Sequence, residues 1–170
     1  MTSRSVFSFM VGMLLLASAS AQTITPNITN EWPNERYTDH NDGTVTDTAT
    51  GLMWAKCSLG QTGADCSTGS ATTMYWQAAL EAASNATLAG HSDWRLPNIK
   101  ELTSLAALDR YSPAINSTVF PNTPSSFFWS SSPDASSSFG AWGVNFNYGY
   151  NSGYILRSGD NRVRLVRSSQ

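Results

Sequence analysis

Charged side chains are scarce in this sequence, and their scarcity limits the partners that the protein can bind. Asp, Glu, Lys and Arg make up 13% of the 170 residues, against about 25% in a typical soluble domain. The formal net charge is −2, so the chain lacks the positive field that draws proteins to nucleic acids or anionic membranes. We therefore expect no nucleic-acid partner. Ser, Thr, Asn and Gly replace the missing charges, which favours neutral hydrogen bonding at an extracellular surface.

Residues that carry out catalysis are also few. The sequence has two histidines, His40 and His91, and neither has a second ligand at the spacing of a metal site. The serines lie in no Gly-x-Ser-x-Gly motif. The Gly-x-x-x-x-Gly-Lys and Gly-x-Gly-x-x-Gly phosphate-binding patterns are absent as well. The sequence therefore predicts a protein that is not an enzyme, and it indicates neither a cofactor nor a metal.

One acidic stretch, from Asp39 to Asp47, resembles a calcium-binding loop. Its glycine comes one position too early for that loop, and the closing glutamate is absent. Asp42-Gly43 between alternating Thr and Val residues favours a β-hairpin turn instead. The hairpin is the preferred interpretation, and a bound calcium ion is the alternative.

Long apolar runs are absent after the first 21 residues. The run from Phe9 to Ala17 follows Arg4 and precedes Ala19-Ser20-Ala21. This pattern predicts a signal peptide over residues 1–21, cleaved between Ala21 and Gln22. The run is too short to span a bilayer, so we expect no membrane insertion. The mature protein is predicted to be secreted or periplasmic, with a net charge of about −3 after the loss of Arg4.

Only two cysteines are present, Cys57 and Cys66. In an exported chain, this spacing favours a disulfide that closes the loop between them. Such a bridge contributes on the order of 2–3 kcal/mol through loop entropy. The alternative is a redox pair, but the intervening residues include no His or Lys to activate a thiol.

Patterns of apolar residues predict both helices and strands over residues 36–168, which is typical of an α+β domain. The preceding residues 22–35 are polar with two prolines and are expected to form a flexible leader. Apolar residues spaced i, i+3, i+4 and i+7 from Trp76 predict a helix that Thr73 caps and that ends near Ser84. A second helix is expected from Ile99 to about Leu108. Two such helices pack on a sheet in a small domain. Strands are expected over residues 36–39, 44–47, 52–55, 127–132, 141–146, 154–156 and 162–167, with a loop over 147–153.

The most densely specified segment is the turn that leads into the second helix. Asn98 as N-cap and Glu101 three residues later form a capping box. We expect Trp94 to be buried and Arg95 to be held by a carboxylate or by carbonyl groups. Asp93 and Arg95 either contact a ligand or form a buried polar brace, and the second role is favoured. The residues that define this motif are Asp93, Trp94, Arg95, Pro97, Asn98 and Glu101.

Two groups of residues are candidates for binding, and the first consists of tyrosines and asparagines between residues 145 and 154. Tyrosine combines a flat apolar ring with a hydroxyl, and asparagine supplies a hydrogen-bond donor and an acceptor. These groups suit the apolar faces and the hydroxylated edges of sugars. The alternative is that these tyrosines fold back on the core. Arg162 and Arg164 are the second group. They bind sulfate or carboxylate if exposed, or pair with Asp39, Asp47 or Asp160, which is favoured. The first group consists of Asn145, Asn147, Tyr148, Tyr150, Asn151 and Tyr154.

Several motifs occur in this sequence in the same order as in one known family. These are Arg36-Tyr37-Thr38-Asp39, Asp42-Gly43-Thr44-Val45-Thr46-Asp47, Thr50-Gly51-Leu52-Met53-Trp54, Gly90-His91-Ser92-Asp93-Trp94-Arg95-Leu96-Pro97-Asn98-Ile99-Lys100-Glu101-Leu102, Phe128-Trp129-Ser130-Ser131 and Val163-Arg164-Leu165-Val166-Arg167. Together they resemble the DUF1566 family, the C-terminal domain of the Legionella collagen-like adhesin. The resemblance covers residues 36–167.

The resemblance implies a fold akin to C-type lectins and the formylglycine-generating enzymes, with two helices packed on small antiparallel sheets and long loops. The best-known member is an adhesin whose domain trimerises and binds sulfated glycosaminoglycans. This chain has no Gly-X-Y repeat and both cysteines lie in its N-terminal half, so neither a collagen stalk nor cysteine oxidase chemistry is expected. We expect a non-catalytic module that binds an extracellular glycan or a surface protein. The alternatives are an assembly domain for protein contacts, including a homo-oligomer, and, less favoured, an enzyme of unknown type.

Overall fold

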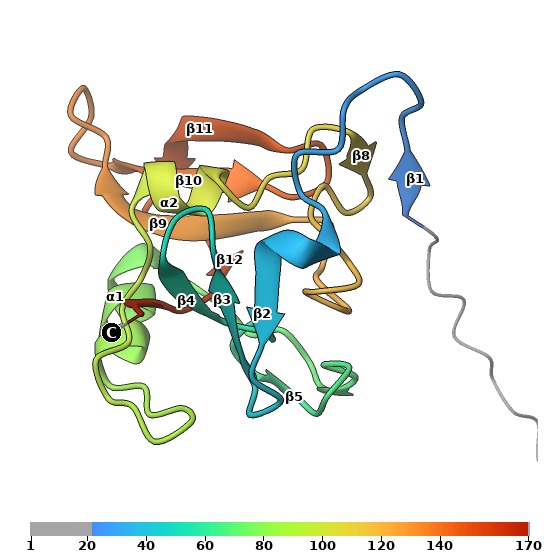
Figure 1. The fold of residues 1–170 in the computed structure, drawn as a ribbon. Helices are drawn as coiled ribbons and strands as arrows, with labels where there is room; N and C mark the ends of the chain where they lie inside the picture. The colour runs from blue at the N-terminus through green and yellow to red at the C-terminus, as the bar shows by residue number, and fades with distance from the viewer. Residues whose placement is uncertain (1–21, 170) are drawn as a thin grey trace, which may run out of the picture.

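The Asp42-Gly43 turn forms the predicted hairpin and begins a four-stranded antiparallel sheet. In the computed structural model, which describes residues 22–169, β2 (Tyr37–Asp39) pairs with β3 (Thr44–Asp47), which pairs with β4 (Leu52–Ala55). The fourth strand, β13 (Val166–Ser168), pairs with β4 and returns the C-terminus to the N-terminal hairpin (Figure 1). Gly43 has a φ of +91°, a conformation that glycine adopts without strain.

A second sheet has five strands in the order β11-β10-β9-β12-β7. Its pairs are antiparallel except β12 with β9, which is parallel. The strands are β7 (Thr73–Met74), β9 (Phe127–Pro133), β10 (Gly140–Asn145), β11 (Tyr150–Leu156) and β12 (Asn161–Arg162). Shorter pairs join β1 (Thr23–Ile24) to β8 (Arg110–Tyr111) and β5 (Gln61–Thr62) to β6 (Thr68–Gly69), and a 3-10 helix, η1, spans Asn34–Arg36. The predicted α+β class, with two helices and small antiparallel sheets, is confirmed.

Both helices are shorter than the sequence predicts. Helix α1 (Trp76–Ser84) starts after the expected cap, because Thr73 pairs with Arg162 in the five-stranded sheet. Helix α2 (Ile99–Thr103) ends five residues before the expected Leu108. The next three N–H groups still bond back to the helix, but the Ala107 N–H donates to the Ala114 carbonyl at 3.0 Å, so the helical pattern cannot continue to Leu108.

Two core clusters cover the opposite faces of the five-stranded sheet. The first fills the space between this sheet, α2 and the four-stranded sheet, and it includes Trp54, Leu102, Phe128 and Val144. The second lies under α1 and includes Ala79, Trp94, Trp129, Ala141 and Leu165. Neighbours such as Phe128 and Trp129 therefore enter different cores, as alternation along a strand requires. No helix among residues 22–169 is long and apolar enough to cross a membrane.

The predicted strand over residues 162–167 is two strands instead of one. Its start, β12, pairs with β9 and β7, and its end, β13, pairs with β4. The intervening residues Val163, Arg164 and Leu165 cross from one sheet to the other and are buried. The predicted loop over residues 147–153 is also shorter, because β11 already begins at Tyr150.

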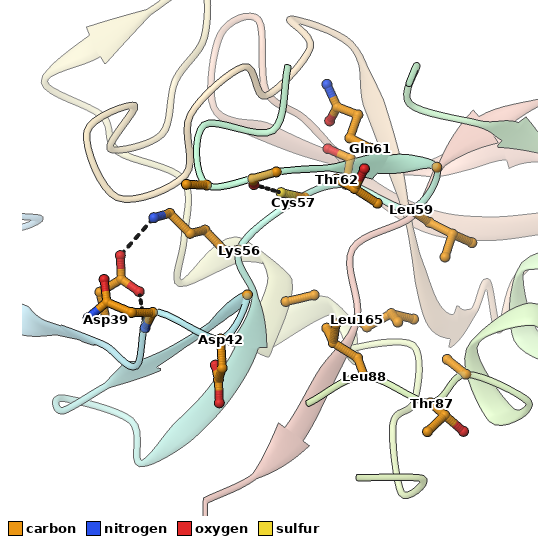
Figure 2. Close-up of a pocket in the computed structure, with 18 of the residues that line it drawn as sticks. Asp39, Asp42, Lys56, Cys57, Leu59, Gln61, Thr62, Thr87, Leu88 and Leu165 are labelled. Carbon is orange, nitrogen blue, oxygen red and sulfur yellow. Dashed lines mark hydrogen bonds and ion pairs between the residues drawn. The ribbon is translucent and has the colours of Figure 1, made fainter. Parts of the chain in front are cut away.

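The predicted disulfide between Cys57 and Cys66 is confirmed, with the two Cα atoms 5.3 Å apart. The bridge closes the loop that follows β4. Next to it, Lys56 donates to Asp39 in β2 at 2.7 Å, which ties the start of this loop to the hairpin (Figure 2). The disulfide and the ion pair therefore fix the loop at two neighbouring positions.

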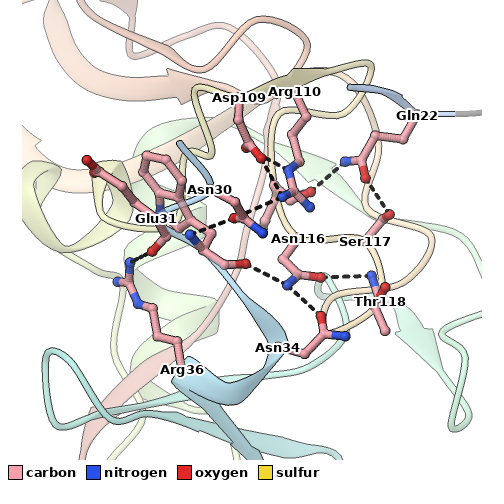
Figure 3. A network of polar contacts seen from close by, with 12 residues as sticks. Gln22, Asn30, Glu31, Asn34, Arg36, Asp109, Arg110, Asn116, Ser117 and Thr118 are labelled. Carbon is pink, nitrogen blue, oxygen red and sulfur yellow. Dashed lines mark hydrogen bonds and ion pairs between the residues drawn. The ribbon is translucent and has the colours of Figure 1, made fainter. Parts of the chain in front are cut away.

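The segment predicted as a leader, residues 22–35, packs against the domain. The Trp32 side chain is 8% exposed, and its indole N–H donates to the Ser104 carbonyl at 2.9 Å. The Asn116 amide donates to the Trp32 carbonyl at 2.8 Å and to the Asn34 side chain at 2.9 Å (Figure 3). Gln22 also donates to backbone carbonyls of the loop before Asn116. The predicted signal peptide lies outside the described residues.

Candidate functional site

The turn from Asp93 to Glu101 is held by its own polar groups. The Arg95 guanidinium donates to both carboxylate oxygens of Glu101 at 2.7 Å. The two halves of the predicted capping box are present, since Asn98 accepts from the Glu101 N–H at 2.9 Å and Glu101 accepts from the Asn98 N–H at 2.8 Å. Burial raises the pKa of Glu101, but the hydrogen bonds from Arg95 and Asn98 lower it by more. Glu101 is therefore ionised and fully engaged inside the turn.

The same turn fastens the C-terminal strand. Arg95 exchanges backbone hydrogen bonds with Val166 at 2.9 and 3.0 Å, and Asp93 accepts from the Arg167 guanidinium at 2.7 Å. Trp94 is 2% exposed, and its indole N–H donates to the Leu88 carbonyl at 3.1 Å. These contacts connect α2, β13 and the second core, so the turn acts as a structural brace.

The acidic stretch from Asp39 to Asp47 is occupied by protein donors. Asp47 pairs with Arg36 through two hydrogen bonds of 2.8 and 2.6 Å, and Asp42 accepts from both the N–H and the hydroxyl of Thr44. Burial raises the pKa of Asp47, and the hydrogen bonds from Arg36 and neighbouring groups lower it below its usual value. Within residues 22–169, no three His, Cys, Asp or Glu side chains gather in a way that would hold a metal ion.

The two candidate arginines point into the protein. Arg164 is fully buried, and its guanidinium donates to the Ala55 and Lys56 carbonyls and to the Thr123 hydroxyl. Arg162 is partly buried and donates to the Ser126 hydroxyl. Neither guanidinium bonds to a carboxylate, and Arg164 does not reach solvent. The carboxylate pairs expected from the sequence are therefore not formed among the described residues, and Arg164 has a structural role through neutral oxygens instead.

The Tyr and Asn candidates do not form one surface. Asn145 and Tyr150 are cross-strand partners, joined by a 3.3 Å hydrogen bond from the amide to the phenol oxygen. Asn147 accepts from the Ser112 hydroxyl at 2.8 Å and so belongs to a loop contact. Tyr148 is 63% exposed on the turn before β11. The remaining two residues, Asn151 and Tyr154, lie further along β11.

Asn151 lines a hollow that the sequence analysis did not identify. It has a volume of about 510 Å³ and lies between α2 and the edge of the five-stranded sheet. We call it the Trp142 hollow, because the indole of Trp142 forms one of its walls. Asn151 donates to the Thr103 hydroxyl at 3.4 Å across the hollow. Its lining residues are Ile99, Lys100, Thr103, Ser104, Trp142 and Asn151.

Trp142 faces this hollow because of its place in β10. Its neighbour Ala141 is buried in the core under α1, so Trp142 points to the opposite face, on the α2 side. The indole lies directly against Gly153 of β11. A Cβ atom at Gly153 would come within 2.8 Å of the Trp142 Cε2 atom and within 2.9 Å of its Cζ2 atom. The glycine therefore allows the ring to rest on the strand.

Tyr154 and Leu156 lie at the end of β11, close to the strand neighbours of Trp142. The register between β10 and β11 shifts at Trp142, so that Gly153 and Tyr154 both lie opposite this one residue. The side chains of Tyr154 and Leu156 are 86% and 62% exposed. The strand edge beside the Trp142 hollow therefore carries large side chains that are open to solvent. Alternation of Ala141 and Trp142 was visible in the sequence, but the pairing with Gly153 was not.

A second hollow, of about 730 Å³, lies under the Cys57–Cys66 loop, and we call it the loop hollow. It is lined by residues 39 and 41–43 of the hairpin, residues 55–64, Ala82 of α1, residues 86–88 after α1, and Leu165. Figure 2 shows the Asp39–Lys56 ion pair on one side of this hollow and Leu88 and Leu165 on the other. None of the residues proposed from the sequence as ligand contacts lines it.

Together, the fold and its hollows define a small α+β domain that is closed by a disulfide and offers two surface depressions. The chain matches the model of the Lcl C-terminal domain family over residues 43–167, which is more than half of its length. It therefore belongs to the Lcl C-terminal domain family, as the ordered motifs predict. No curated protein matches the chain.

Proposed function

We propose that the domain is a non-catalytic, adhesin-like binding module that recognises an extracellular glycan through the Trp142 hollow. The observation that carries this proposal is the placement of the half-buried Trp142 ring at a depression whose lining also includes Lys100, Thr103 and Asn151. The family membership supports an adhesin-like role. A fold akin to C-type lectins, which the family resemblance implies, would suit a glycan as ligand.

The chemistry of the hollow suits a sugar ring. An indole presents a flat apolar face, against which the C–H groups of a pyranose stack. Asn151 and Thr103 supply an amide and a hydroxyl, and Lys100 supplies an exposed ammonium group. These groups lie on the walls around the ring, where they reach the hydroxyls on the edges of a stacked sugar. The arrangement separates apolar contact from hydrogen bonding as a sugar requires.

An extracellular or periplasmic location is part of this proposal. The closed disulfide supports it, because such bridges persist in oxidising compartments. The low charge and the abundance of Ser, Thr, Asn and Gly also agree with a protein outside the cytosol. Fractionation of cells that express the full chain, with N-terminal sequencing of the product, tests the location and the predicted cleavage before Gln22.

A glycan array with the mature chain, residues 22–170, tests the binding function. We expect binding to at least one class of glycan, and a loss of about tenfold or more in Trp142→Ala. Tyr148→Ala is the control, because Tyr148 is also an aromatic residue that reaches solvent but lies outside both hollows. A folded protein that binds no glycan, or a Trp142→Ala variant with unchanged affinity, would contradict the proposal.

The second candidate function is assembly with other protein subunits. Phe139, Tyr154 and Leu156 are 75%, 86% and 62% exposed at the β11 edge, which is a pattern found at protein interfaces. Light scattering separates the two functions. Assembly with itself predicts a stable oligomer that Leu156→Glu converts to a monomer, whereas a strict monomer without protein partners argues against assembly.

A further inference from the structure

The loop hollow has the dimensions of a small-molecule site and is independent of the Trp142 hollow. Its volume of about 730 Å³ lies within the range of roughly 300–1,000 Å³ that is typical of ligand pockets. The two hollows have no lining residue in common. A ligand in the loop hollow would therefore bind without touching the proposed glycan site.

The walls of the loop hollow are fixed by contacts that do not involve a ligand. The Lys56 N–H donates to the Gly43 carbonyl at 2.9 Å, which joins the wall to the hairpin. The Leu59 N–H donates to the Val163 carbonyl at 2.9 Å, and Arg164 donates to the Ala55 carbonyl at 2.8 Å. The disulfide closes the far end of the same segment. The hollow is therefore formed in advance, which lowers the cost of binding.

The interior of the loop hollow is mainly apolar, and its charged groups lie on the hairpin side. Leu59, Leu88 and Leu165 line it together with several alanines. Asp39 and Lys56 neutralise each other through their 2.7 Å ion pair. This leaves Asp42 as the charge on the lining without a cationic partner. The hydrogen bonds from Thr44 engage Asp42 Oδ1 alone, so Oδ2 remains available as an acceptor.

We propose that the loop hollow is a second ligand site, which binds a small molecule that combines an apolar body with a protonated amine. The leucines and alanines accept the apolar body. The Asp42 carboxylate accepts a hydrogen bond from the ammonium group at the rim. An anionic ligand would meet the uncompensated charge of Asp42 and bind less tightly. This second site is distinct from the proposed glycan site, and ligand binding in the loop hollow does not depend on glycan binding.

Three probes of similar shape test this site on the mature chain: 2-phenylethylammonium, 2-phenylethanol and 3-phenylpropionate. Methyl NMR spectra are recorded during titration with each probe. We expect saturable shifts at the methyl groups of Leu59, Leu88 and Leu165. The ammonium probe should bind about threefold more tightly than the alcohol, as for an exposed ion pair, and the carboxylate probe should bind most weakly. High salt should reduce these differences.

Two variants separate the site from its alternatives. Asp42→Asn keeps an oxygen acceptor for Thr44 but removes the charge, so it should abolish the preference for ammonium and leave the affinity for the alcohol unchanged. Trp142→Ala should leave all three affinities unchanged. The proposal is wrong if no probe shifts the three leucines saturably, if ammonium and alcohol bind equally, or if Asp42→Asn retains the preference.

Discussion

The guanidinium of Arg164 lies over the ring of Phe120, with its Cζ atom 4.9 Å from the ring centroid, in a fully buried position. Its hydrogen-bond partners are two carbonyls and two hydroxyls, and none is a carboxylate. A buried cation without an anion is costly unless neutral dipoles and aromatic faces replace water. Burial lowers the pKa of Arg164 to about 9, so the guanidinium is still protonated at neutral pH.

We expect Arg164→Met to lower the free energy of unfolding by about 3 kcal/mol or more. Methionine fills part of the space but leaves the Ala55 and Lys56 carbonyls without their donor, and each unsatisfied buried group costs roughly 1–3 kcal/mol. Arg164→Lys keeps the charge but has one donor nitrogen in place of the guanidinium group. The lysine variant should therefore be less stable than the parent but more stable than the methionine variant. Urea denaturation of the three proteins measures this. A methionine variant as stable as the parent would show that the buried charge is not needed.

Arg164 also shows where prediction from the sequence ends. In a single strand over residues 162–167, alternation puts Val163 and Leu165 on one side and Arg162 and Arg164 on the other. In the structure, the chain leaves one sheet and enters another between Arg162 and Val166, and all three intervening residues are buried. That crossing depends on strand pairings distant in sequence, which alternation cannot reveal.

Local signals, in contrast, predicted their structures well. The Asp42-Gly43 hairpin, the Asn98–Glu101 capping box and the Cys57–Cys66 bridge each depend on residues within about ten positions of one another. The candidate site depends on contacts between distant segments. Trp142 forms a hollow only because α2 lies beside it and Gly153 is its strand neighbour. Composition drew attention to the tyrosines of the neighbouring loop instead.

Acid should destabilise the domain through Asp47. Burial raises the pKa of Asp47, but the ion pair with Arg36 and the hydrogen bonds from Thr50 and Ala49 together lower it below its usual value in the folded state. The ion pair therefore contributes full stability above the unfolded pKa of about 3.9, and this contribution is lost as the pH falls through the folded-state pKa. Asp47→Asn should cost about 3 kcal/mol at pH 6 and much less at pH 2. Urea midpoints of parent and variant at both pH values test this, and an equal difference at both would contradict it.

Truncation of Trp94 should affect mainly stability, whereas truncation of Trp142 should affect mainly binding. Trp94 is 2% exposed within the brace, and Trp94→Ala should lower the free energy of unfolding by about 3–5 kcal/mol. Trp142 is only half-buried, so Trp142→Ala should cost about 1 kcal/mol or less and affect binding instead. Urea denaturation of both variants gives the comparison. If Trp94→Ala were as stable as the parent, the brace would not be the structural role of the turn.

Gly153 should control the glycan site without contacting the glycan. Gly153→Ala places a Cβ atom within 2.8 Å of the Trp142 indole, so the indole ring must move away from β11. We expect a changed Trp142 fluorescence signal, a loss of glycan affinity that approaches that of Trp142→Ala, and little loss of stability, because the displaced ring moves toward solvent. Ser152→Ala is the matched control, since Ser152 pairs with Gly143 on the opposite face of the same strand. If Gly153→Ala bound the glycan as the parent does, the position of the ring against the strand would not matter for recognition.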